Sequence, residues 1–310
     1  MYISVVIPTY NRLDILKKCL LSLELQKLDV FISNYEVVVV DDGSTDGTTE
    51  WIKSNSNSLP HVRLIEQEHA GPAAGRNLGV EKSVGDVIVF IDSDIVVTNV
   101  FLVSHSESLR YSWNKYGTKL TFTYGAVINT NNFLNPTKER HKLRDLSWAY
   151  FATGNVAIDK QTLINSGLFD IAFKLYGWED LELGERLRSM GVRLIKCPQA
   201  VGYHWHPEFS IKQIPDLIRV EKERAKMALV FYRKHPTLRV RLIIQYTFIH
   251  RILWELLTLG GLLNERSLYP LFDFLLKNGQ SSLALEVLRI PLNLIGVRAI
   301  YREAALLGIR

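Results

Sequence analysis

Two nearly unbroken apolar runs in this sequence each end in a pair of aspartates. EVVVVD runs into Asp41 and Asp42, and DVIVFID runs into Asp92 and Asp94. Strands without polar alternation are typical of parallel sheets that are covered on both faces. Ligands of such sheets bind beyond the carboxyl ends of the strands. We therefore expect the two acid pairs to meet at one edge of a sheet, although two solvated turns would give the same pattern.

The segments around these runs alternate between strand and helix patterns. ISVVI at 3–7 is a further buried strand that Pro8 is expected to end, and Asn11 is expected to cap a helix over 13–23. This alternation predicts an α/β domain with a mainly parallel sheet. The other elements expected in this half are helices around 47–54 and 74–83 and a short strand at 62–65.

The second half is less regular until it becomes helical after residue 211. A domain boundary is therefore expected near residue 210, followed by a helical extension over 211–310. The elements expected before it are strands at 120–128, 152–160 and 192–198, a polar loop at 129–145, a helix at 177–191 and a turn at GYHWHP.

Composition narrows the classes of partner. The formal net charge of +5 suits an anionic small ligand or an anionic membrane surface, and it does not argue for nucleic acid. The apolar run 242–263 contains His250, Arg251 and Glu255, so a packed or interfacial helix is expected instead of a membrane span. The N-terminus lacks a secretory pattern, and two cysteines without CxxC spacing indicate a reduced cytoplasmic setting.

Six motifs occur in an informative order: VVIPTYNR, VVVVDDGSTDGT, GPAAGRNLGV, FIDSDI, GWEDLELGERL and YHWH. Over residues 3–206 the sequence resembles family 2 of the inverting, nucleotide-sugar-dependent glycosyltransferases. The resemblance implies the GT-A fold, a Rossmann-like mixed, mainly parallel sheet flanked by helices. It also implies a catalytic domain at 1–210, with a nucleotide-sugar half at 1–128 and an acceptor half at 129–210.

The resemblance implies a divalent cation, Mn²⁺ or Mg²⁺, that bridges the phosphates of the donor and takes oxygen ligands from aspartate. It assigns Asp94 to the metal, and Asp92 with Ser93 to the nucleotide-sugar. A late histidine completes the metal shell in many enzymes of this fold. His204 is the first candidate and His206 the second, although a lone histidine is more often structural.

The nucleotide itself has further candidate contacts by resemblance. Asp42 is expected to read the base, and Pro8, Thr9 and Tyr10 to line the same edge. Arg76 is expected to hold an acid or a phosphate in place. The structural alternatives are a helix cap within DDGSTDG, strand termination by Pro8 and a surface arginine on a helix.

The resemblance places the catalytic base at Asp180, the second acid of the pair Glu179-Asp180. Inversion needs a carboxylate that takes the acceptor proton, and the dipole at a helix N-terminus favours the ionised form. Glu179 is expected to place the acceptor. Trp178 is either a sugar platform or a core residue.

The function expected is that of a metal-dependent inverting hexosyltransferase using a nucleoside-diphosphate sugar, with UDP favoured by family habit. Its acceptor is a sugar or a lipid-linked alcohol, in polysaccharide, glycolipid or other glycoconjugate synthesis. The alternative is a non-catalytic nucleotide-sugar binder or scaffold that keeps the fold.

The basic, apolar residues 211–310 either contact the inner face of an anionic membrane, cap the catalytic domain or form a homodimer interface. Neither a P-loop nor a strand-following GxGxxG is found.

Overall fold

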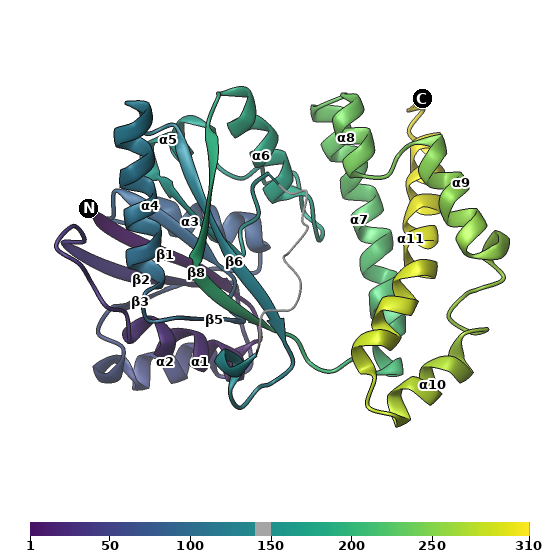
Figure 1. Ribbon diagram of the computed structural model, residues 1–310, viewed down its shortest axis with the longest axis horizontal. Coiled ribbons are helices and arrows are strands. Elements are labelled where there is room, and N and C mark those ends of the chain that lie inside the picture. Colours follow the sequence, from purple (N-terminus) through teal and green to yellow (C-terminus); the bar gives the residue numbers. More distant parts are fainter. Residues whose placement is uncertain (140–149, 310) are drawn as a thin grey trace. The chain divides into compact units, whose positions relative to one another are not determined.

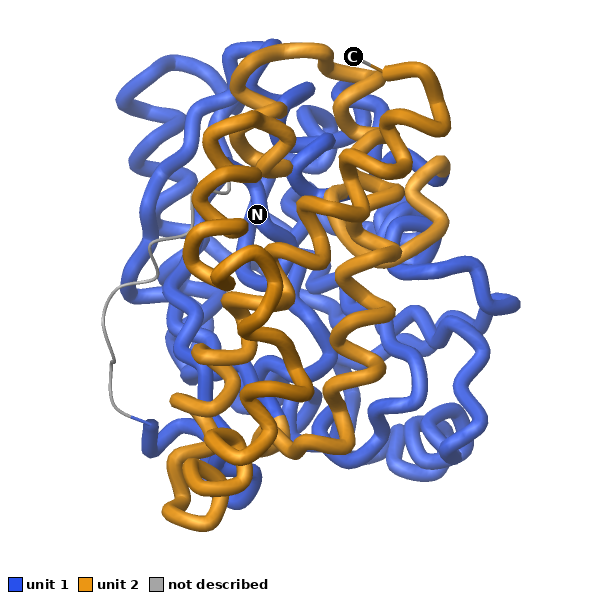
Figure 2. Tube along the Cα trace, turned by 90° about the vertical axis from the view of Figure 1, so that its right-hand side faces the viewer, with its two compact units in different colours: residues 1–171, 179–206 blue, residues 172–178, 207–310 orange. Residues whose placement is uncertain are grey.

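The computed structural model describes residues 1–139 and 150–309, and these divide into two compact units. Unit 1 comprises Met1–Ile171 and Glu179–His206, and unit 2 comprises Ala172–Trp178 and Pro207–Arg310 (Figure 2). Residues 140–145 of the expected polar loop lie outside the described part. The use of unit 1 for catalysis and the boundary at residue 210 stay predictions.

Unit 1 is built on one mixed eight-stranded sheet with the order β3-β2-β1-β4-β7-β6-β8-β5 (Figure 1). Strands β1 to β4 are all parallel, whereas β7 runs antiparallel to β4 and to β6. β8 is parallel to β6 and antiparallel to β5. The strands are β1 (Tyr2–Thr9), β2 (Asn34–Asp41), β3 (Val62–Glu66), β4 (Val87–Ile91), β5 (Ile95–Val97), β6 (Thr121–Thr130), β7 (Asn155–Asp159) and β8 (Arg193–Trp205).

Helices cover both faces of this sheet, as the unbroken apolar strands predict. Alternate residues of one strand face opposite layers: Val5 packs with α1 and α4, whereas Val6 packs with α3. α2 lies on the first face, and α5 and α6 lie on the second. The helices are α1 (Leu13–Glu24), α2 (Thr48–Ser54), α3 (Pro72–Lys82), α4 (Phe101–Tyr116), α5 (Lys160–Asn165) and α6 (Glu179–Ser189), with short 3₁₀ turns at Ser56–Ser58 and Pro136–Lys138.

Three local expectations were wrong, two of them near the end of β1 and the third in β8. β1 continues through Pro8 to Thr9, and the register partner of Pro8 is Val40 of β2. α1 starts after Arg12, and Asn11 instead adopts a left-handed conformation with φ of 51°. The start of α1 is held by Asp46, whose carboxylate accepts the N–H of Leu13 at 2.9 Å.

GYHWHP is mostly strand and not a turn. β8 runs through Trp205, because β5 and β6 lie on either side of it and pair with its last residues. β5, α4 and α5 are elements that the sequence patterns did not predict.

Unit 2 is helical, and the packing of α7 with α11 forms its axis. A core of Phe209, Phe272, Ala284 and Leu288 joins α10 and α11 to the segment before α7. No helix in the described part of the chain is long and apolar enough to cross a membrane. Its elements are α7 (Ile214–Lys234), α8 (Leu238–Ile243), α9 (Phe248–Leu257), α10 (Tyr269–Lys277) and α11 (Ser281–Leu306), with 3₁₀ turns at Ile211–Gln213 and Leu259–Gly261.

Candidate active site

The carboxyl ends of the parallel strands bring the two acid pairs to one edge of the sheet. Thr9 at the end of β1 is the register partner of Asp41 at the end of β2. The N–H of Asp42 then donates to the carbonyl oxygen of Thr9 at 2.9 Å. β4 lies on the other side of β1, so the chain that leaves it delivers Asp92 and Asp94 to the same edge.

Asp92, Asp94 and His204 form a three-residue cluster. Each offers a ligand atom, and these atoms lie within 4.8 Å of one another. The register of the sheet explains the meeting, because His204 of β8 pairs with Ile95, the residue that follows Asp94. Nε2 of His204 lies 3.1 Å from Oδ1 of Asp94.

The cluster fits a divalent cation. Oδ1 of Asp94 is buried and accepts no well-formed hydrogen bond from any residue that the structure describes, which leaves a lone pair for a metal. Two carboxylates and one imidazole make an oxygen-rich donor set that Mn²⁺ accepts. His206 lies beside this set, with its ring centroid 4.0 Å from that of His204. Ser93, between the two acids, is buried.

The electrostatics of the cluster keep Asp94 ionised. Burial alone would raise its pKa, but the contact with His204 and the positive charges of His204 and Arg12 lower it below the ordinary value. Burial acts on His204 in the opposite sense, yet Asp94 and then Asp92 raise the pKa of this imidazole. Without a cation the two groups therefore behave as an ion pair.

Arg12 is a site residue that the sequence reasoning missed. Its guanidinium forms an ion pair with Oδ2 of Asp94. Arg12 stands at the end of PTYNR, directly after the first strand, and β1 is the neighbour of β4 in the sheet. The order of strands cannot be read from a single sequence, so no local pattern marks Arg12 as a partner of the second acid pair.

Arg76 links the acid cluster to α6. It is a buried residue on α3, where its Nη2 donates to Asp92 at 3.0 Å and its Nη1 donates to Glu179 at 3.2 Å. α3 can lie this close to the sheet because Gly79 has no side chain. A Cβ at this position would come within 2.4 Å of Val6. The surface-arginine alternative is therefore wrong.

Glu179 and Asp180 begin α6. Glu179 is buried, and its Oε2 has no hydrogen-bond partner among the described residues. Asp180 is partly buried, and its Oδ1 accepts the N–H of Leu181 at 2.8 Å. Burial and the negative charge of Glu179 raise the pKa of Asp180 to about 7, against the lowering effect of Arg76. These two effects outweigh the helix N-terminus, which was expected to favour the ionised form.

Trp178 belongs to unit 2. Its indole Nε1 donates to the carbonyl oxygen of Arg224 at 2.8 Å. The guanidinium carbon of Arg224 lies 5.0 Å from the centroid of the indole ring, and Phe231 packs nearby. The N–H and one ring face are thus engaged inside the helical unit, which favours the core alternative.

Asp42 organises the loop after β3. Its two carboxylate oxygens accept the N–H groups of Ala70 at 2.8 Å and Gly71 at 2.9 Å. His69 of this loop lies against Tyr10, with ring centroids 4.3 Å apart. The base-reading role of Asp42 stays a prediction, and a base bound here would share its carboxylate with the loop.

The remaining members of the predicted nucleotide edge lie at the end of β1. Pro8 is partly buried, and Tyr10 is exposed. Thr9 is buried, and its Oγ1 has no hydrogen-bond partner among the described residues. Asp41 stabilises the turn that follows β2. Its carboxylate accepts hydrogen bonds from the N–H of Ser44 at 2.9 Å and from the hydroxyl of Thr49 at 2.7 Å.

Comparison with known proteins adds independent findings. Residues 4–110 match the model for glycosyl transferase family 2. Chondroitin synthase of Escherichia coli is 31% identical over 242 residues, which cover 66% of this chain and 35% of that protein. The uncharacterized glycosyltransferase YfnE of Bacillus subtilis is 24% identical over 266 residues, with 69% of this chain and 67% of that protein covered. The chain thus spans about a third of the first relative's length and two thirds of the second's.

Solved structures share the fold. The mannosyltransferase PcManGT of Pyrobaculum calidifontis superimposes with a TM-score of 0.56 at 19% identity, and 96% of this chain and 85% of that chain are covered. A TarS structure from S. aureus superimposes with a TM-score of 0.55 at 16% identity, with 100% and 93% covered. These likenesses confirm the predicted GT-A fold.

Proposed function

We propose that this chain is a metal-dependent, inverting glycosyltransferase of glycosyl transferase family 2, the family whose model matches residues 4–110. The observation that carries the proposal is one continuous network at the carboxyl edge of the sheet. Asp94 contacts His204, Asp92 contacts Arg76, and Arg76 contacts Glu179, the neighbour of Asp180. Such a network joins a cation site for a diphosphate to a carboxylate suited to proton transfer.

The donor is proposed to be a nucleoside-diphosphate sugar. Asp92, Asp94 and His204 would hold Mn²⁺ or Mg²⁺, which supplies positive charge to a departing diphosphate. The TarS structure contains UDP-GlcNAc, and the PcManGT structure contains GDP-Man and Mn²⁺. UDP is our first choice of nucleotide, and both nucleotides belong in the test.

Asp180 is proposed to act as the general base. The acceptor oxygen forms a bond to the anomeric carbon while the bond from that carbon to the diphosphate oxygen breaks. The diphosphate leaves with the electron pair, and Asp180 takes the hydroxyl proton. A pKa raised to about 7 suits this role, since a base works best when its pKa lies near the working pH.

Arg76 and Glu179 have positioning roles in this proposal. The guanidinium of Arg76 holds Asp92 and Glu179 at hydrogen-bond distance, so it fixes the cation site relative to the start of α6. The second oxygen of Glu179 is buried with no hydrogen-bond partner in the described part of the chain, and it is available to an acceptor hydroxyl. The acceptor is proposed to be a sugar or a lipid-linked alcohol.

Calorimetric titration with UDP and GDP, with and without Mn²⁺, tests the cation site. We expect Mn²⁺ to strengthen binding of one nucleotide to the wild type, and Asp94→Ala to remove that gain. Asp14→Ala is the matched control, because the side chain of Asp14 is 86% exposed and forms a surface ion pair with Lys17 at 3.6 Å. Equal nucleotide affinity with and without Mn²⁺ in the wild type would refute the cation site. Binding without turnover across donors and acceptors would favour the scaffold alternative.

A further inference from the structure

α9 is an amphipathic helix whose polar side faces the protein. Not one of its residues is buried. Arg298 of α11 donates two hydrogen bonds to Glu255, at 2.9 and 2.6 Å. Trp254 donates to Gln245 at 2.6 Å. A surface helix of a globular protein normally shows the opposite arrangement, with its apolar stripe packed against the core.

The apolar side of α9 is consequently exposed. Ile249 is 75% exposed and Leu256 is 68% exposed. The other exposed apolar residues of this helix are Phe248, Ile252, Leu253 and Leu257. Soluble monomers rarely leave so large a continuous apolar patch in water unless it binds something.

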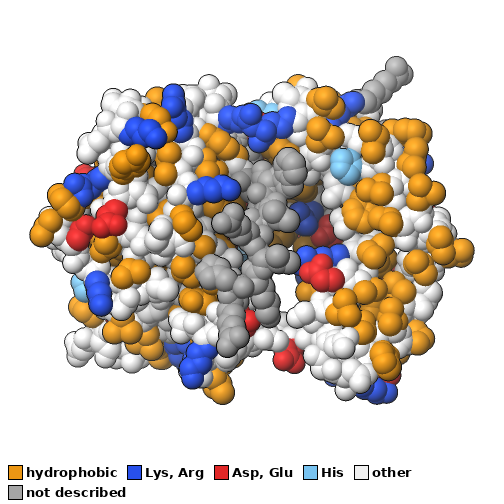
Figure 3. Space-filling view, in the orientation of Figure 1, with side chains coloured by type: hydrophobic (Ala, Val, Ile, Leu, Met, Phe, Trp, Pro, Cys, Tyr) orange, Lys and Arg blue, Asp and Glu red, His pale blue; other side chains and the backbone are white. Residues whose placement is uncertain are grey.

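The patch continues from α9 over the following turn to α10. Leu259 and Leu262 project from the turn, with Leu262 72% exposed, and Phe274 is exposed on α10. Figure 3 shows hydrophobic side chains gathered over these elements at the right of unit 2. We call the exposed apolar residues from Phe248 to Phe274 the α9–α10 face.

The net charge of unit 2 favours an anionic lipid surface over a second copy of this chain as the occupant of this face. Unit 2 carries seventeen lysines and arginines against nine aspartates and glutamates, whereas unit 1 carries twenty against twenty-three. A second copy would bring two strongly basic units together, and their repulsion opposes the contact. An anionic lipid surface attracts the same charges, and its acyl region accepts the apolar side chains.

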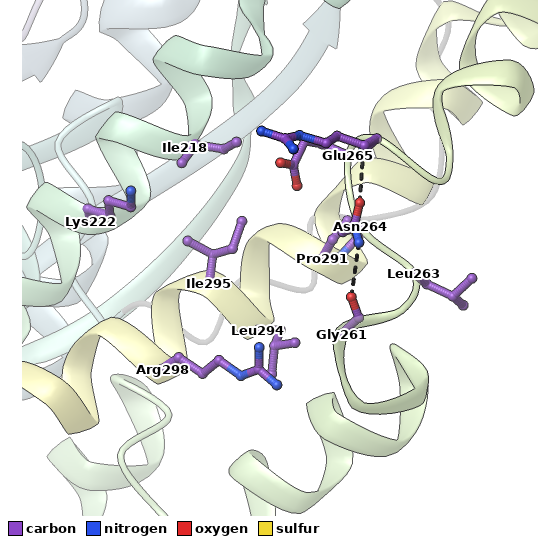
Figure 4. Close-up of a pocket in the computed structure, with 11 residues that line it drawn as sticks. Ile218, Lys222, Gly261, Leu263, Asn264, Glu265, Pro291, Leu294, Ile295 and Arg298 are labelled. Atoms are coloured by element: carbon purple, nitrogen blue, oxygen red, sulfur yellow. Dashed lines mark hydrogen bonds between the residues drawn. The ribbon is translucent and has the colours of Figure 1, made fainter.

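A cavity of about 400 Å³ adjoins the turn between α9 and α10. Ile218 of α7, Ile295 of α11 and Lys222 line it (Figure 4). Arg266 is a further lining residue. Asn264 shapes this part of the turn, because its Nδ2 donates to the carbonyl oxygen of Gly261 at 3.1 Å and its Oδ1 accepts the N–H of Arg266 at 3.0 Å. The lining also includes Arg298 and one acid, Glu265, so three cations stand against one carboxylate. This excess of positive charge beside apolar walls suits a lipid phosphate with its chain.

We propose that the α9–α10 face docks this protein onto an anionic lipid bilayer. The apolar residues of α9 and of the turn enter the headgroup and acyl boundary, and Arg266 and Lys222 contact lipid phosphates. This association is peripheral, and it is independent of the donor chemistry proposed for unit 1.

Vesicle flotation of the full chain tests the docking. The probes are vesicles of phosphatidylcholine alone and vesicles in which it is mixed with phosphatidylglycerol. We expect binding to the mixed vesicles that weakens with added salt, and much weaker binding to phosphatidylcholine. Soluble inorganic phosphate, as a competitor, should leave bilayer binding largely intact, because most contacts are apolar.

Two variants identify the surface. Ile249→Gln combined with Leu256→Gln should weaken partitioning about tenfold or more, since two apolar side chains lose their burial. Its control is Val30→Gln combined with Val84→Gln, two exposed apolar residues of unit 1. Arg266→Gln should weaken partitioning about fivefold. Its control is Lys196→Gln, an exposed cation of unit 1.

Several outcomes would overturn the proposal. Absence of binding to either vesicle type, equal binding to both, or wild-type binding by the Ile249 and Leu256 double variant would each do so. Sedimentation without lipid measures the oligomeric state of the wild type and of this double variant. A stable wild-type dimer that the double variant converts to monomers would assign the face to a second copy instead. Melting curves of each variant establish that it is folded before its binding is compared.

Discussion

Asp180 is the residue on which the proposed chemistry depends most. Asp180→Asn keeps the shape of the side chain but removes its ability to take a proton. Turnover should fall by about 10²- to 10⁴-fold, the usual contribution of a general base. Nucleotide binding should be largely unchanged, because no predicted nucleotide contact is altered. Steady-state kinetics and titration of the same preparation measure both quantities.

The control for this variant is Glu50→Gln, at an exposed acid in the first turn of α2. It removes one negative charge from another helix N-terminus and should leave turnover unchanged. Turnover of Asp180→Asn at the wild-type rate would remove Asp180 from the role of base.

The raised pKa of Asp180 gives a pH dependence with a defined sign. A base must be deprotonated, so kcat/KM should fall about tenfold per unit as the pH drops below about 7. The same shift affects folding, because the folded chain holds this proton more tightly than the unfolded chain. Its contribution to the free energy of unfolding is therefore present at low pH and lost as the pH rises from about 4 through about 7.

A pH series of kinetics and denaturant unfolding checks both effects. In Asp180→Asn, the loss of stability between pH 5 and pH 8 should be smaller than in the wild type. A wild-type rate that stays constant down to pH 5 would contradict the assignment of the group with the raised pKa as the base.

At the scale of elements, β8 determines which histidine faces the acids. Its pairing with β5 places His204 opposite Ile95, and the ligand atom of His204 lies in the cluster with Asp92 and Asp94. His204→Ala should therefore abolish most of the Mn²⁺-dependent gain in nucleotide affinity. His206→Ala, one residue beyond the end of β8, is the matched control and should retain most of it. Titration that finds the larger loss in His206→Ala would reverse the assignment.

The long apolar elements could be predicted from the sequence because each carries its own signal. β4 is an unbroken run of apolar residues, β2 contains such a run at 37–40, and acids follow both runs where the chain leaves the sheet. That local pattern, together with the order of the motifs, was enough to locate both acid pairs and Arg76. It was also enough to expect helices on both faces.

Elements with polar interiors left no such signal. α4 buries Ser104, His105 and Ser112, so its apolar periodicity is weak. His105 is satisfied there by Thr123 at 2.7 Å and Asn155 at 2.9 Å. Burial lowers the pKa of His105 to about 4, so it packs as a neutral residue. Hydrophobic spacing cannot reveal a helix whose buried side chains are polar.

Contacts that depend on the register between strands distant in the sequence could not be predicted from the sequence either. β5 has only three residues, and its partner β8 comes about a hundred positions later in the sequence. The extension of β8, and the contacts of Arg12 and His204 with Asp94, follow from this pairing and from the order of strands. A single sequence offers the residue types but not the register that joins them.

The whole molecule combines two units of opposite charge. Unit 1 contains the region that matches the family, the acid cluster and an excess of acidic residues, whereas unit 2 is basic and exposes the α9–α10 face. The division suggests separate tasks, with chemistry in unit 1 and attachment in unit 2. Activity measured on soluble acceptors and binding measured on vesicles can therefore be tested independently.

The most direct test of the central claim is the anomeric configuration of a product formed by the full chain. Donors with α-linked UDP and GDP sugars are incubated with Mn²⁺ and a panel of acceptors, and the new linkage is assigned by NMR from the one-bond coupling between the anomeric carbon and its proton. We expect a β-linked product that requires Mn²⁺ and that Asp180→Asn fails to form. An α-linked product, or a β-linked product formed equally well by Asp180→Asn, would contradict it.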